Sequence, residues 1–274
     1  MFCKICGGES ATLFNNKTTI LQRYPIDYYR CGNCNFIQTE TPYWLPEAYS
    51  SAITSLDIGL VGRNIAISRY LSSLINCFFD RKGAFLDYGG GYGMLVRMMR
   101  DNGFNFYRFD SYCENLFANH FDLDDSPVRK FELLTAFELF EHLEHPAEEL
   151  QKMLQFSDSV FFSTELAPDR KLTSPDDWWY FTPETGQHIA LYSAESLRAL
   201  AKRMDCNFYT DGHTLHLITR RKLNPLFFRL SIHPKIARVI VKTTPQKSLL
   251  SDDFNFIRNY INSNENPFRS SDLH

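Results

Sequence analysis

The feature that most constrains the fold is an alternation of short apolar segments with helical segments through the centre of the chain. The apolar segments have strand length, whereas the segments between them place apolar residues at the spacing of one helix face. Strands are predicted at 84–87, 105–110, 131–136 and 159–164, and helices at 65–75, 94–99, 143–156 and 193–204. Strands that alternate with helices predict an α/β fold whose parallel sheet is covered on both faces.

Two further apolar segments, 207–210 and 215–219, flank the dipeptide Asp211-Gly212. That dipeptide is typical of a tight turn between antiparallel strands. We therefore expect an antiparallel hairpin to close one edge of the sheet.

A glycine-rich loop, Asp87–Gly93, lies between the first predicted strand and the helix that follows it. Its glycines allow the backbone to turn sharply and to approach a ligand closely, because no Cβ atom is in the way. The dinucleotide fingerprint G-x-G-x-x-G would need glycine where Met94 stands, and the Lys-Ser/Thr ending of a phosphate loop is missing. The acidic residue ahead of the glycines disfavours a pyrophosphate and suits a ligand with a cationic end.

A second carboxylate, Asp110, ends the next predicted strand, 23 residues after Asp87. An acid at that place in such a sheet can accept the hydroxyl groups of a ribose. A nucleoside with a positive charge fits both carboxylates, and S-adenosylmethionine is such a ligand; the alternative is that the glycines only turn the chain. The predicted cofactor-binding residues are Asp87, Tyr88, Gly89, Gly91, Gly93, Asp110 and, after the 131–136 strand, Phe137.

Four cysteines near the amino terminus form two Cys-x-x-Cys pairs, Cys3/Cys6 and Cys31/Cys34. Two such pairs can place four thiolates around one ion, which is the ligand set of a tetrahedral structural zinc site without an open position for water. We expect Zn²⁺ to hold a small zinc-ribbon-like module over residues 1–44. Four unrelated thiols and a redox-active pair are the alternatives. Two prolines in 41–46 predict a linker.

Three groups of motifs make the chain resemble class I S-adenosylmethionine-dependent methyltransferases. Asp87–Gly93 looks like their D-x-G-x-G-x-G motif, and segment 137–143 looks like the E-x-x-E-H-L segment of one bacterial branch. Segment 178–193 looks like that branch's W-W-Y-x-x-P, G-Q-H-I and Y-S signature. The resemblance implies a Rossmann-like class I sheet and a methyltransferase domain over residues 45–222. The family's third strand has no convincing counterpart between Asp110 and Phe131.

Members of this branch often occur among genes for surface-polysaccharide synthesis, and sugar C-methyltransferases share the amino-terminal zinc module. Those C-methyltransferases carry a further large carboxy-terminal domain, whereas about 50 residues follow the predicted hairpin here. The resemblance therefore implies methyl transfer to a sugar or glycan precursor, at oxygen rather than carbon. The acceptor would be a sugar, a nucleotide-sugar or a lipid-linked glycan.

Methyl transfer from a sulfonium is an in-line displacement that depends mainly on proximity and orientation. A hydroxyl acceptor is a weak nucleophile at neutral pH, so we expect a general base within hydrogen-bond reach. His188 is the first candidate, because Gly186 and Gln187 beside it indicate an exposed, shaped loop, and His142 is the second, held by Glu141. For both histidines the alternative is an ordinary structural role.

The aromatic segment 178–181 is the densest in the chain. Aromatic faces bind sugar rings and exclude water from a site, and they also fill cores. Both interpretations fit the sequence.

The net charge of −3 is unevenly distributed: residues 220–250 contain eight basic and no acidic residues, which leaves −11 for the rest. The acidic body argues against a nucleic-acid partner. The sequence shows neither a signal peptide nor an apolar run of roughly 20 residues, so a cytoplasmic location is expected.

The carboxy-terminal extension, residues 223–274, combines apolar and basic residues. A helix that begins at Pro234 would place Lys235, Arg238 and Lys242 on one face. That face predicts either peripheral contact with the inner membrane surface or packing against the acidic body.

Two other functions are compatible with the motifs. One is an rRNA methyltransferase with a zinc module, although residues 136–139 read A-F-E-L where base-methylating enzymes carry N/D-P-P-Y/F. The other is a non-catalytic scaffold that binds zinc and the cofactor, and the intact Asp87–Gly93 loop with Asp110 argues against it.

Overall fold

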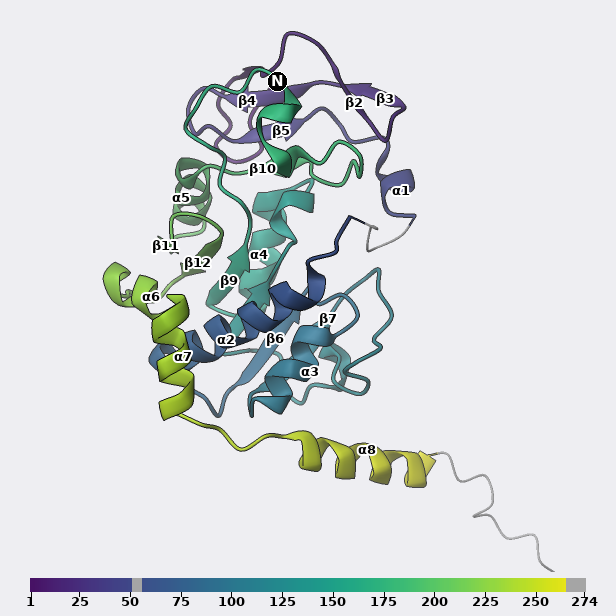
Figure 1. Ribbon diagram of the computed structural model, residues 1–274, viewed down its shortest axis with the longest axis vertical. Coiled ribbons are helices and arrows are strands. Elements are labelled where there is room, and N and C mark those ends of the chain that lie inside the picture. Colours follow the sequence, from purple (N-terminus) through teal and green to yellow (C-terminus); the bar gives the residue numbers. More distant parts are fainter. Residues whose placement is uncertain (51–55, 265–274) are drawn as a thin grey trace, which may run out of the picture.

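The computed structural model of the protein describes residues 1–50 and 56–264, and its centre is a six-stranded sheet in the order β11-β12-β9-β8-β6-β7 (Figure 1). Strands β6 to β9 pair in parallel, whereas β12 is antiparallel to both β9 and β11. The predicted α/β fold with a parallel sheet and an edge hairpin is therefore confirmed. The strand bounds are β6 Ala84–Tyr88, β7 Asn105–Phe109, β8 Leu133–Ala136, β9 Ser159–Ser163, β11 Asn207–Thr210 and β12 Leu215–Thr219.

The sheet ends at β7. This agrees with the sequence, in which no segment between Asp110 and Phe131 matches the third strand of the family. After β7 the chain forms a short 3₁₀ helix, η1 (Leu123–Asp125), and a single parallel bridge between Asp122 and Arg108. The Arg108 side chain also reaches Asp122, with 2.7 Å between Nε and Oδ1. An ion pair thus takes the place of a paired strand at this edge.

Helices cover both faces of the sheet. On one face Phe161 of β9 packs against Phe228 of a carboxy-terminal helix, with ring centroids 6.4 Å apart. On the other face the Tyr88 hydroxyl donates to Glu149 of α4. Ser193 caps α5, because its Oγ accepts from the Ser196 N–H. The helix bounds are α2 Leu60–Phe78, α3 Met94–Asp101, α4 Pro146–Phe156 and α5 Ala194–Arg203.

The amino-terminal strands form a second sheet, in the order β1-β4-β5-β10, at one end of the central sheet (Figure 1). Strand β10 (Ala190–Leu191) comes from the long segment after β9, so that segment and the amino-terminal strands build one structure. They also share a hydrophobic core, to which Ile26, Phe181 and Leu191 belong. The remaining bounds are β1 Ser10–Thr12, β2 Thr18–Ile20, β3 Tyr24–Ile26, β4 Tyr28–Cys31 and β5 Ile37–Thr39.

The prediction of a linker at 41–46 is wrong. Trp44 is 1% exposed, and its indole N–H donates to the Gly186 carbonyl at 2.8 Å. A short helix, α1 (Leu45–Ala48), begins directly after it with Pro46 in its first turn. Proline is tolerated there because the first-turn N–H groups have no partner inside the helix.

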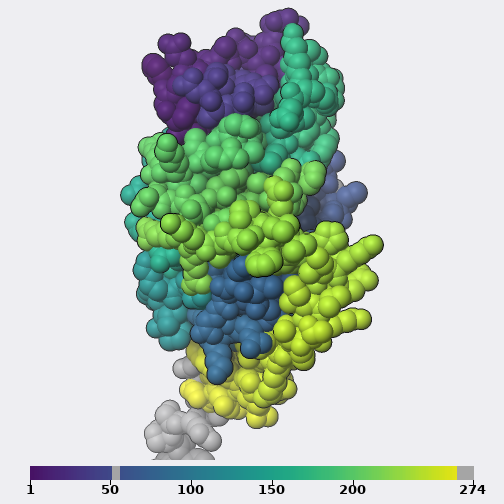
Figure 2. Space-filling view, turned by 90° about the vertical axis from the view of Figure 1, so that its left-hand side faces the viewer, coloured from purple at the N-terminus to yellow at the C-terminus, as the bar shows by residue number. Residues whose placement is uncertain are grey.

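The carboxy-terminal extension folds into α6 (Pro225–Ser231), α7 (Pro234–Thr243) and α8 (Leu250–Asn264), and α6 and α7 lie beside α2 (Figure 2). Lys235, Arg238 and Lys242 of α7 are exposed. The buried ion pair between the extension and the body joins an acidic residue of α8, Asp253, to a basic residue of the body, Arg100, with 2.6 Å between Oδ1 and Nη2. Within the described ranges, no helix is both long and apolar enough to cross a bilayer.

Candidate active site

The glycine loop follows β6 at the carboxyl edge of the parallel strands. Gly91 and Gly93 have φ angles of +54° and +85°, which residues with a side chain rarely adopt. A Cβ atom at Gly93 would lie 2.7 Å from the Asn115 Oδ1, whereas one at Gly91 would meet no atom within 4 Å. The loop is therefore packed at its end and open at Gly91, where a ligand can approach the backbone.

Asp110 holds this loop in place. Its Oδ2 accepts from the Gly91 N–H at 2.9 Å, and its Oδ1 accepts from the N–H groups of Tyr112 and Cys113, both at 2.8 Å. A carboxylate offers about four acceptor positions, so one position is left for a ribose hydroxyl. Asp110 can thus shape the loop and bind the cofactor at the same time.

Asp87 and Tyr88, the last two residues of β6, directly precede the glycines of the loop and are buried. Asp87 is 3% exposed and accepts from the Thr135 hydroxyl at 2.6 Å; burial, with a smaller contribution from Asp110, raises its pKa to about 7. The Tyr88 ring packs on Phe109 with centroids 4.8 Å apart. Direct contact of these two side chains with the cofactor, and that of half-buried Phe137, stays a prediction.

The buried Asp87 carboxyl should make stability depend on pH. Because its pKa is raised from 3.8 to about 7 in the folded protein, the folded state keeps a proton that the unfolded state loses, and stability falls as pH rises between these values. We expect Asp87→Asn to remove the Asp87 part of this decline, which has a limiting slope of about 1.4 kcal/mol per pH unit, and to leave the part that comes from other buried carboxyl groups. Urea unfolding of both proteins from pH 4.5 to 7 measures it, and parallel pH profiles would contradict the assignment.

A second group of predicted residues meets after β8, at the 3₁₀ helix η2 (Phe140–His142). A carboxylate oxygen of Glu141 and one ring nitrogen each of His142 and His188 lie within 4.8 Å of one another. The Glu141 side chain is fully buried, and its carboxylate interacts with the Tyr180 hydroxyl, but neither oxygen makes a hydrogen bond of good geometry with a described residue. Burial, together with the nearby Glu138, raises the Glu141 pKa to about 7.

Both histidines are held by backbone carbonyls. His142 Nδ1 lies 3.1 Å from the Gln187 oxygen, and His188 Nδ1 lies 2.6 Å from the Tyr180 oxygen. Because a carbonyl only accepts, Nδ1 carries the proton in each ring and Nε2 keeps a lone pair. Burial lowers both histidine pKa values, that of His188 to about 4, so both rings are neutral at pH 7.

The loop that carries His188 is fixed on several sides. Gly186 and Gln187 are buried, so the prediction of an exposed loop is wrong. The Gln187 Nε2 donates to the Ala48 carbonyl at 2.8 Å, and the Ile189 N–H donates to the Glu141 carbonyl at 2.9 Å. The G-Q-H-I segment therefore fastens the histidine to both the amino-terminal part and η2.

Sequence reasoning missed several residues that border this cluster. Glu138 accepts from the Ser163 hydroxyl at 2.6 Å, and its other oxygen lies 3.6 Å from Arg63 Nε. The E-x-x-E-H pattern contains Glu138 and could have identified it. Arg63 lies far away in the chain, and no local pattern marks it.

Tyr49, which was also missed, connects the two halves of the site. Its ring lies 6.1 Å from that of His142 and is stacked at 5.7 Å on that of Tyr112, whose N–H bonds Asp110. Leu139, two residues before Glu141, packs against the glycine loop, since a Cβ atom at Gly89 would lie 3.1 Å from the Leu139 side chain. The cluster and the cofactor loop are therefore neighbours.

Three of the four aromatic residues in segment 178–181 pack in a hydrophobic core. Trp178, Tyr180 and Phe181 are buried in the core shared with the amino-terminal strands. Trp179 is 68% exposed and is the member of this segment that a sugar ring could reach.

The four cysteines predicted as metal ligands come together. The Cys3 and Cys34 sulfurs are 3.6 Å apart, those of Cys6 and Cys31 are 3.5 Å apart, and all four lie within 4.8 Å of one another. A tetrahedron of roughly 2.3 Å zinc–sulfur bonds has edges of about 3.8 Å. The residues present therefore fit a structural zinc ion.

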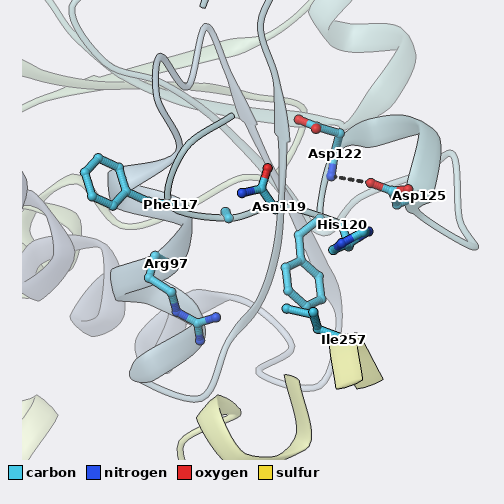
Figure 3. Close-up of a pocket in the computed structure, with 9 residues that line it drawn as sticks. Arg97, Phe117, Asn119, His120, Asp122, Asp125 and Ile257 are labelled. Carbon is cyan, nitrogen blue, oxygen red and sulfur yellow. Dashed lines mark hydrogen bonds between the residues drawn. The ribbon is translucent and has the colours of Figure 1, made fainter. Parts of the chain in front are cut away.

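A pocket of about 590 Å³ lies outside the predicted site (Figure 3). It is formed by α3, the 117–125 segment and α8, with Arg97, His120 and Ile257 in its lining. None of the predicted catalytic or cofactor-binding residues lines it.

Among solved structures, the chain is similar in fold to several methyltransferases. The plantazolicin methyltransferase BpumL with SAH is 13% identical over 66% of this chain and 95% of its own, with a TM-score of 0.48. CalO1, a methyltransferase in calicheamicin biosynthesis, is 12% identical over 57% of this chain, with a TM-score of 0.41, and this chain covers 54% of its length. An O-methyltransferase family 2 protein from Planctomyces limnophilus is 14% identical over 65% of each chain, with a TM-score of 0.43.

No curated protein matches the chain. The family model described as "Methyltransferase domain" matches residues 63–210, a range that contains the glycine loop, Asp110 and the Glu141 cluster. Since this match covers more than half of the 274 residues, the chain belongs to the methyltransferase domain family and is an S-adenosylmethionine-dependent methyltransferase.

Proposed function

We propose that the protein methylates a hydroxyl oxygen of a sugar or glycan precursor in surface-polysaccharide biosynthesis. The observation that carries this proposal is the cluster of Glu141, His142 and His188 beside the cofactor loop. It offers neutral imidazole nitrogens and a buried carboxylate, which are groups that bind and deprotonate a hydroxyl. The polysaccharide role and the choice of a sugar come from the motif resemblance.

S-adenosylmethionine supplies a methyl group on a positively charged sulfur, so the protein's own task is to align and activate the acceptor. Gly91 and Asp110 would hold the nucleoside at the open part of the loop. His188 Nε2, whose lone pair is free because Nδ1 donates to Tyr180, can receive the proton of the acceptor hydroxyl. His142 and Glu141 would position that hydroxyl.

We expect His188→Ala to lower kcat by about 10²-fold or more, as removal of a general base does, with the cofactor Kd unchanged. His188 contacts Tyr180 and His142 rather than the residues proposed to bind the cofactor, so the two measurements separate catalysis from binding. Single-turnover methyl transfer and calorimetric titration with the cofactor give the two values. Exposed His145→Ala is the matched control, and full activity of the His188 variant would remove this residue from the mechanism.

The acceptor can be identified with labelled cofactor. The protein would be incubated with a cytoplasmic extract that contains nucleotide-sugars and glycolipids, and the labelled product would be analysed by mass spectrometry. A methyl ether on a sugar supports the proposal. Label on nucleic acid or protein, or on carbon or nitrogen, contradicts it.

Three further assignments belong to this proposal. The four cysteines would hold a structural Zn²⁺, on the strength of their sulfur distances. The protein would act in the cytoplasm. Its carboxy-terminal helices, which expose apolar side chains such as Val239 and Phe254 near basic ones, would contact the inner membrane surface where lipid-linked glycans are found.

A further inference from the structure

We propose that Glu141, His142 and His188 bind a divalent transition-metal cation, at a site separate from the four cysteines. Binding of the ion does not depend on the proposed function, but its role in catalysis rests on that function. The donor set of two imidazoles and one carboxylate is one that Mn²⁺, Fe²⁺, Co²⁺ and Zn²⁺ accept.

The first support is the state of the Glu141 carboxylate. It is fully buried, and apart from a nearby Tyr180 hydroxyl neither oxygen has a hydrogen bond of good geometry in the described part of the chain, although buried polar groups are nearly always hydrogen-bonded. An ionised carboxylate in this position is costly unless a cation compensates it. A bound ion within reach of both oxygens removes that cost.

The second support is the orientation of the imidazoles. Each donates Nδ1–H to a main-chain carbonyl, Gln187 for His142 and Tyr180 for His188. Histidines that bind metals almost always make such a bond with their second nitrogen, because it fixes the ring and the tautomer. The arrangement leaves one lone pair on each ring for an ion.

The third support is the charge around the cluster. Glu138 and Asp57 are the acidic neighbours, and both interact with Arg63, at 3.6 Å and 2.8 Å. With Glu141 ionised and the histidines neutral, two glutamates and one aspartate against one arginine leave the region net negative. A divalent cation is therefore favoured electrostatically.

The ion would change the role of His188. Three protein ligands leave coordination positions open, as in catalytic rather than structural metal sites, and vicinal hydroxyl groups of a sugar can occupy them. His188 Nε2 would then be a ligand, and the ion rather than the imidazole would make the acceptor hydroxyl more acidic. Loss of activity in His188→Ala is expected on either account, so metal binding must be measured directly.

The test is titration of the full-length protein with Mn²⁺, in the absence of cofactor and acceptor, after dialysis that leaves any cysteine-bound zinc in place. Manganese suits nitrogen and oxygen ligands and competes poorly for four thiolates. We expect about one Mn²⁺ per chain by calorimetry, with an electron paramagnetic resonance spectrum that shows coupling to imidazole nitrogen. Glu141→Gln and His142→Ala should each weaken binding at least about tenfold, whereas His145→Ala should bind as the wild type does.

Folding of each variant is checked by circular dichroism and by cofactor titration, and His188→Ala serves as a third ligand variant if one of the others does not fold. If the wild type binds neither Mn²⁺ nor added Zn²⁺ at this site, or if all folded variants bind like the wild type, the proposal is overturned. Failure of the sugar assay with intact Mn²⁺ binding would instead count against the proposed function alone.

Discussion

Replacement of Asp110 by alanine is expected to weaken cofactor binding by about 10- to 100-fold. The carboxylate holds the N–H groups of Gly91, Tyr112 and Cys113 and has one acceptor position left for the ribose. Hydrogen bonds to charged groups contribute about 1.5–3 kcal/mol each, so loss of the ribose contact alone accounts for this range. Loosening of the loop at Gly91 adds to the effect.

Calorimetric titration with S-adenosylmethionine measures the change. Exposed Asp124→Ala is the matched control, because it removes the same charge from the same part of the surface without touching the loop. Asp110→Asn keeps an acceptor for the backbone amides and should retain more affinity than the alanine variant. An unchanged Kd for Asp110→Ala would place the nucleoside elsewhere.

Cys31→Ser is expected to remove the bound zinc and to destabilise the amino-terminal structure. Structural zinc contributes on the order of 10 kcal/mol in small modules, which is comparable to the whole stability of a domain. Cys31 ends β4, and β4 pairs with β5, which in turn pairs with β10 next to the His188 loop. The Cys34 carbonyl also accepts from Ser193 at the start of α5. Loss of the ion should therefore lower both the melting temperature and the activity.

Metal analysis and thermal unfolding of the full-length protein test this expectation. After dialysis that leaves the cysteine-bound ion in place, wild-type protein should retain a zinc that Cys31→Ser lacks, and Cys77→Ser, a change at an exposed cysteine of α2, should behave as the wild type. A wild type without zinc, whose unfolding is insensitive to Cys31→Ser, would refute a structural metal. The N-terminal cysteines would then be ordinary thiols.

The elements of the central sheet were predictable because each carries its own local pattern. Asp211-Gly212 marks the turn between β11 and β12, and Ser193 marks the start of α5. The segment 41–46 was misread because its prolines are a local signal, whereas the burial of Trp44 depends on Gly186, 142 residues away. Local patterns do not report such contacts.

The sequence by itself determined which residue types are available: a glycine loop with acidic residues around it, two cysteine pairs and an E-x-x-E-H segment. Only the tertiary structure decided how they are used. It buries Asp87, whereas Asp110 accepts a hydrogen bond from Gly91 of the glycine loop. It also places His188 next to Glu141, because the Ile189 N–H donates to the Glu141 carbonyl. The reason is that burial and convergence depend on contacts between distant segments, and these contacts set which carboxylates are hydrogen-bonded, which are left without a partner, and which imidazoles face them.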